Sequence, residues 1–178
     1  MERSPGWCYL FVHHEKMDTF VERIERKGKF ETFVHRTAKS IRTRSGVRTT
    51  EVPTVSGLVF VRGHHARISR FLSEEFSQLH LVNDCSTKRV AVIPDDVMRP
   101  FMRIATVEPT RVRVLLNPIE CYANGRQRVR VTSGLLEGME GYVVRIDRDR
   151  RLVCAIGNMT IAISGAHQEA LEEAEETA

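Results

Sequence analysis

The strongest constraint on the fold is a run of short apolar segments separated by turn residues between positions 128 and 164. Val129 and Val131 alternate with arginines, which is the period of a half-buried strand. The charged stretch 147–150 and the dipeptide Gly157-Asn158 have the composition of tight connections between antiparallel strands. The expected strands are 128–131, 142–146, 152–156 and 159–163.

The connection after the first of these strands is rich in glycine. Gly134, Gly138 and Gly141 fall within eight residues, and glycine takes positive φ freely, so a bent loop is expected here rather than a helix. Four short strands with close turns predict a small antiparallel barrel. An unspecialised barrel remains an alternative. The β-branched residues between 143 and 163 favour a stable β state over a helical one.

Composition indicates a soluble globular protein, expected in the cytoplasm. The 178 residues are 42% hydrophobic and 28% charged, enough for one ordinary domain or two small ones. We expect no membrane association, because no apolar run approaches about 18 residues. The four cysteines stand singly, which predicts reduced, mostly buried thiols without a zinc site or a disulfide.

The charge is unevenly distributed along the chain. Residues 165–178 contain five glutamates and no Lys or Arg, and we expect them to form a disordered acidic tail that solvates the terminus. Residues 1–164 therefore carry 27 basic against 18 acidic groups. A basic body of this kind suggests a polyanionic partner.

The first two-thirds of the chain predicts an α+β sandwich over about residues 6–107. Trp7–His13 is apolar on both faces, which favours a central strand. An amphipathic helix follows, with Gly28 expected as its C-cap. The further expected elements are strands at 30–35, 55–62, 80–82 and 90–93 and helices at 66–76 and from 94 onward, the last disturbed by Pro100.

The segment 36–50 interrupts this pattern with five basic residues and no acidic one. It is either a solvated hairpin or an arm that lies along a phosphate backbone, since Lys and Arg bind phosphates without regard to base sequence. No aromatic residue is present to stack on bases, so a duplex backbone is favoured over a single strand.

Two groups of residues resemble the NusG family of transcription factors. Val129-Arg130-Val131 leading into 134–141 is similar to the family's KOW motif, although Leu135 stands where proline is common. Upstream, Trp7-x-Tyr9, Gly57–Val61 and 92–96 resemble the family's N-terminal (NGN) domain. The resemblance implies an NGN α/β sandwich at 6–116, a linker at 117–127 and an SH3-like KOW barrel at 128–164. Residues 127–163 look most like the specialised UpxY antiterminators of surface polysaccharide operons.

The resemblance implies a factor that binds the β′ clamp helices of bacterial RNA polymerase, suppresses pausing and promotes antitermination. The matching apolar positions are Phe11, Leu58 and Phe60; they could equally fill the core, and Leu58 stands where an aromatic is common. Such contacts are worth roughly 2 kcal/mol or more at a hot spot. Upstream or non-template DNA, and alternatively nascent RNA, would lie against Arg36, Lys39, Arg42, Arg44, Arg48, Arg62 and Arg67.

Other function classes receive less support. No nucleotide-binding loop and no histidine spacing typical of a metal site is present, so we expect no cofactor, no metal and no enzyme activity. The protein is expected to be a monomer. The barrel's partner is left open between Rho and a small-subunit ribosomal protein. A ribosome-associated or RNA-binding KOW protein and a general housekeeping NusG remain the alternatives.

Overall fold

The computed structural model describes residues 5–166 and 169–174, and it is α+β with antiparallel sheets, as expected. The chain forms two compact units, Met1–Val92 and Ile93–Ala178. This division precedes the helix that starts at Asp95, whereas the sequence places a linker at 117–127. The difference arises because Arg103 of that helix donates to backbone oxygens in the loop at 135–137, and the short strand at 112–115 pairs with 160–163.

The first unit is built on a three-stranded antiparallel sheet in the order β1-β5-β2. The expectation that the first strand is central is wrong, because β5 pairs with both neighbours. The elements of this unit are β1 (Gly6–Phe11), η1 (His14–Lys16), α1 (Met17–Gly28), β2 (Glu31–Phe33), β3 (Arg36–Thr43), β4 (Gly46–Pro53), β5 (Leu58–Gly63) and α2 (His65–Glu75). Residues 80–82 and 90–93 form no regular strands; an isolated bridge joins Asn83 to Val90, and Ala91 donates its backbone N–H to Val82 O at 2.9 Å.

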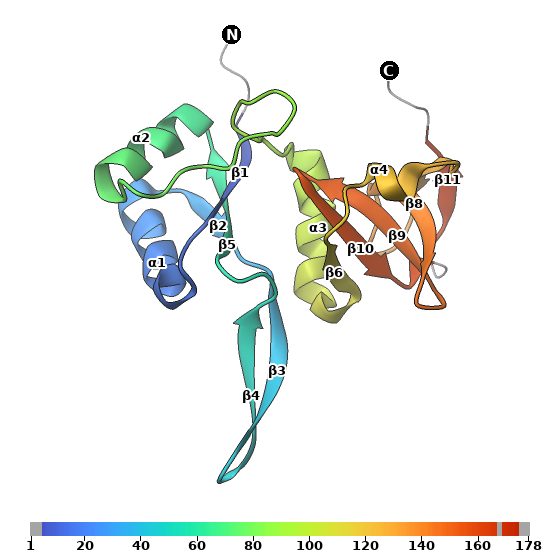
Figure 1. Ribbon diagram of the computed structural model, residues 1–178, viewed down its shortest axis with the longest axis horizontal. Coiled ribbons are helices and arrows are strands. Elements are labelled where there is room, and N and C mark those ends of the chain that lie inside the picture. Colours follow the sequence, from blue (N-terminus) through green and yellow to red (C-terminus); the bar gives the residue numbers. More distant parts are fainter. Residues whose placement is uncertain (1–4, 167–168, 175–178) are drawn as a thin grey trace. The chain divides into compact units, whose positions relative to one another are not determined.

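One face of this sheet is covered by α1 and α2 (Figure 1). Alternate residues of the two longer strands point to this face, because successive side chains in a strand point to opposite sides. The helices contribute residues at helical spacing, and all members of the cluster are nearly inaccessible to solvent. The cluster includes Cys8, Leu10, Val59, Val61, Phe20, Ile24, Ile68 and Leu72.

The end of α1 differs from the expectation in one residue. Gly28 is the last helical residue, and Lys29 takes the left-handed conformation with φ 55°. Glycine is required at 28 for a different reason, since a Cβ there would lie 2.6 Å from the Phe30 ring. The glycine therefore permits close packing of Phe30 and does not supply the C-cap conformation.

The second unit contains a six-stranded antiparallel sheet in the order β11-β7-β8-β9-β10-β6. The four expected strands are β7 to β10, and two short strands at the edges were not expected. The elements are α3 (Asp95–Val107), η2 (Pro109–Arg111), β6 (Val112–Leu115), α4 (Glu120–Ala123), β7 (Arg128–Val131), β8 (Glu140–Ile146), β9 (Asp149–Ile156), β10 (Met159–Ser164) and β11 (Leu171–Glu173).

Strand β11 corrects the expectation of a disordered tail at 165–178, as far as that tail is described. Thr132 donates its backbone N–H to Ala170 O at 2.9 Å, and β11 continues this pairing along β7. Glu172 lies opposite Arg130, whose pKa is raised by its hydrogen bond and charge interaction with Glu140 and further by Glu172. The acidic strand β11 thus pairs with β7, a strand that carries arginines. Residues 167–168 and 175–178 of the expected tail lie outside the described part.

None of the described helices is long and apolar enough to cross a membrane.

The cysteines should fall into two classes of reactivity. Cys8 and Cys154 are buried, and burial raises the pKa of each thiol to about 12, whereas Cys85 and Cys121 are exposed. Because the thiolate is the nucleophile, alkylation of the native protein near pH 8 should modify only Cys85 and Cys121. Mass spectrometry after iodoacetamide treatment checks this, with the denatured protein as a control in which all four react.

Candidate nucleic-acid interface

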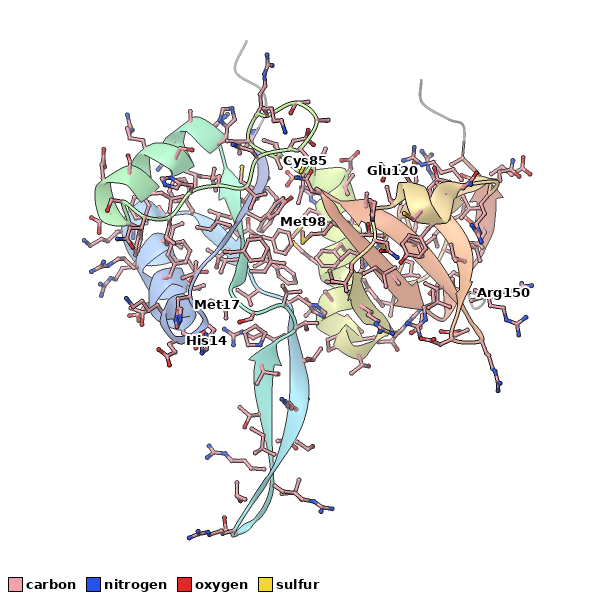
Figure 2. All side chains as sticks on the ribbon, in the orientation of Figure 1. His14, Met17, Cys85, Met98, Glu120 and Arg150 are labelled. Atoms are coloured by element: carbon pink, nitrogen blue, oxygen red, sulfur yellow. The ribbon has the colours of Figure 1, made fainter. Side chains whose placement is uncertain are left out.

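The basic segment forms a separate two-stranded hairpin, β3–β4, that projects from the sheet of the first unit (Figure 1). Its register runs from Arg36 opposite Pro53 to Thr43 opposite Gly46. Every residue from Lys39 to Glu51 is exposed. Figure 2 shows that its side chains spread to both sides, with no other element of the first unit over the outer half.

The cations of this hairpin lie on both of its faces. Residues directly opposite share a face, so Arg42 lies on the face of Val47, while Lys39 lies with Ile41 and Arg48 on the other. Arg44 lies in the turn. In the described part of the chain, no ion pair joins Lys39, Arg42, Arg44 or Arg48 to a carboxylate. These four cations are available to an external anion.

Arg36 differs from the other four cations. Its guanidinium forms an ion pair with Asp18 of α1 at 2.5 Å. This contact holds the base of the hairpin against the helix, so Arg36 is already engaged. The sequence gives no signal for the pair, since 18 residues separate the partners and only folding brings them together.

Arg62 and Arg67 are not brought together with the hairpin. Arg62 lies near the far end of β5, since the strand runs from Leu58, near the hairpin's exit, to Gly63, and Arg67 lies beyond it in α2. Arg62 lies 3.6 Å from the carboxylate of Glu31, and Arg67 lies over the Phe30 ring at 5.1 Å. Both are therefore occupied within the first unit, and they form no continuous surface with the hairpin.

The three apolar candidates share one face of the sheet but differ in exposure. Phe11 pairs with Leu58, and Tyr9 pairs with Phe60, which places all four side chains on the face opposite the helices. Phe11 is 52% exposed, whereas Leu58 and Phe60 are 5% and 1% exposed. The Phe60 ring also contacts Phe33, at 6.1 Å between centroids. Only Phe11 presents the exposed aromatic surface that the resemblance implies.

The glycine-rich loop of the second unit is bent as expected. Gly134 and Gly138 have φ of 79° and 89°, which side chains rarely adopt. Gly141 is needed for space, because a Cβ there would lie 2.2 Å from Val153 O on the neighbouring strand. Arg103 of α3 donates to Leu135 O at 2.9 Å and to Glu137 O at 2.7 Å. The loop is therefore held in place by α3.

Alanine substitutions of Phe11 and Phe60 should have different effects on the free energy of unfolding, because one residue is exposed and the other is buried. Phe60→Ala should lower the free energy of unfolding by about 3 to 5 kcal/mol, as for buried aromatics generally. Phe11→Ala should change it by less than about 1 kcal/mol, since half of the ring is already in water. Urea denaturation of both variants checks this; equal losses would show that Phe11 is a core residue.

Comparison with known proteins found similarity to solved structures alone. No protein-family model matches the sequence, and no curated protein matches it. Among solved structures, the chain is similar to one titled "Domain interaction in Thermotoga maritima NusG", with 19% sequence identity and a TM-score of 0.48. The alignment covers 97% of this chain and 98% of that one.

Proposed function

We propose that this protein is a transcription elongation factor that binds bacterial RNA polymerase, suppresses pausing and promotes antitermination. The observation that carries the proposal is the β3–β4 hairpin, with four exposed cations that no described carboxylate neutralises. The NusG-like residue patterns of both units support the same function. Surface polysaccharide operons are the proposed targets, following the resemblance to the UpxY antiterminators.

The proposed mechanism has two contacts and no covalent step. Phe11 inserts into an apolar site on the clamp helices, where an exposed aromatic gains most from burial. The β3–β4 hairpin then lies along upstream or non-template DNA and contacts phosphates through Lys39, Arg42, Arg44 and Arg48. The barrel is left to recruit a further partner, for which Rho and a small-subunit ribosomal protein are the candidates.

Neutralising the tip of the hairpin should weaken DNA binding without unfolding the protein. The variant Arg42→Thr/Arg44→Ser/Arg48→Thr keeps strand-forming residues in the strands and removes three cations. For binding to a short DNA duplex, the slope of the logarithm of the association constant against the logarithm of salt concentration should become less negative by roughly 2 to 3. Termination readthrough in a transcription assay should fall in parallel.

A matched control removes the same charge from another surface. Arg26, Lys29 and Arg70 are exposed on or beside α1 and α2, and no ion pair engages them in the described ranges. The variant Arg26→Gln/Lys29→Asn/Arg70→Gln should retain the wild-type salt slope and readthrough. Equal losses in the two triple variants would show a general charge effect and count against the hairpin.

Polymerase binding tests the first contact. Purified protein should bind core RNA polymerase but not an enzyme lacking the β′ clamp helices, and Phe11→Ala should weaken binding by about 30-fold, the loss of a hot-spot side chain. Binding that is independent of the clamp helices, or unchanged in Phe11→Ala, would contradict the proposed contact. No binding at all would transfer the function to the ribosome or to free RNA.

A further inference from the structure

The β8–β9 hairpin of the second unit carries three arginines that the proposed function does not use. Arg145 and Arg150 are directly opposite each other in the antiparallel register, so their side chains share one face. Both are exposed, and Figure 2 marks Arg150 on this hairpin. Like charges at directly opposite positions destabilise a strand pair, so the free protein gains nothing from this arrangement.

The carboxylates of the same hairpin do not neutralise these arginines. Asp147 lies 3.4 Å from the guanidinium of Arg113 on β6, and Asp149 lies 3.4 Å from that of Arg151. Within residues 5–166 and 169–174, no ion pair joins Arg145, Arg148 or Arg150 to an acidic group. Three guanidinium groups therefore face solvent within six residues of sequence.

The turn between β8 and β9 contains a second residue that is unfavourable for the stability of the free protein. Asp147 and Arg148 have φ of 53° and 67°, so both central residues of this two-residue turn are left-handed. Such turns favour Asn or Asp first and Gly second, because glycine has no Cβ to strain the backbone. Arg148 occupies the position where glycine would be most stable. The hairpin thus keeps arginine at three positions where another residue would stabilise the free fold.

We propose that the β8–β9 hairpin is a second nucleic-acid contact, in which Arg145, Arg148 and Arg150 bind the phosphate backbone of duplex DNA. A guanidinium group can donate two parallel hydrogen bonds to the oxygens of one phosphate. A bound phosphate also relieves the repulsion between Arg145 and Arg150. The one aromatic side chain of β8 and β9, Tyr142, packs against Val144, Val153 and Ala162 and not beside these arginines, so a single strand would find little stacking surface here. The proposal does not depend on the polymerase contact.

The test uses the full chain, in the background of the β3–β4 triple variant, so that remaining duplex binding reports this second site. Arg145→Thr/Arg150→Thr should weaken binding to a short DNA duplex. The slope of log K against log salt concentration should also become less negative by roughly 2. Arg148→Gly should make this slope less negative by roughly 1. Both variants should also unfold at a higher temperature than their parent, because the first removes repulsion between opposed arginines and the second places glycine at a left-handed turn position. Arg26→Gln/Arg70→Gln, which changes the same charge as the first variant, should alter neither duplex binding nor its salt slope.

The combination of weaker binding and higher stability distinguishes a binding site from a structural role. Arginines that only support the barrel would give lower unfolding temperatures when replaced. Duplex affinity that stays unchanged in both variants would overturn the proposal. Loss of affinity for a single-stranded RNA but not for the duplex would also overturn it and transfer the site to RNA. Each of these outcomes leaves polymerase binding through Phe11 as a separate question.

Discussion

Pairing of β2 with β5 is the constraint on which the candidate interface depends. These two strands are neighbours in the sheet, and the chain leaves one and returns to the other through the β3–β4 hairpin. At the root, Thr54 donates its backbone N–H to His35 O at 2.9 Å, and the ion pair between Arg36 and Asp18 joins the hairpin to α1. The hairpin has no core of its own, so its direction is set by the sheet and its base.

The distribution of carboxylates explains why particular cations remain available. Asp18 engages Arg36 at the hairpin base, and Glu31 lies beside Arg62 on the sheet. In the second unit, Glu140 pairs with two arginines of β7, and Asp147 and Asp149 engage Arg113 and Arg151. Of the described cations that no carboxylate engages, seven lie on the β3–β4 and β8–β9 hairpins, while others, such as Arg26, Lys29 and Arg70, lie elsewhere on the chain. Exposed ion pairs contribute little stability, but their placement decides where an external polyanion finds positive charge.

The sequence predicts the regular elements well where they are long and periodic. Helix α1 and strands β7 to β10 lie where their apolar periodicity places them. Strand β6 was not predicted although Val112-Arg113-Val114 alternates as β7 does, and β11 has three residues, too few to show a period; both exist through pairing with distant strands. The role of Gly28 was misassigned because local sequence cannot show that Phe30 packs against it.

The candidate site was predictable in its chemistry but not in its exposure. The lack of carboxylates within 36–50 is visible in the sequence and correctly marked an exposed basic segment. The family resemblance singled out Phe11, Leu58 and Phe60, and the strand register places them on one face, but which of them is covered depends on tertiary packing, and only Phe11 is exposed. The opposed pair Arg145 and Arg150 required the strand register, which turn residues alone did not fix.

The most direct test of the account is to map the DNA contact on the protein residue by residue. Backbone amide chemical shifts would be recorded by nuclear magnetic resonance while a short DNA duplex is added at low salt. The account predicts that the shifts concentrate on residues 39–48 and 145–150. Changes concentrated instead on α1 and α2, with both hairpins unaffected, would contradict the claim that the unpaired cations form the interface.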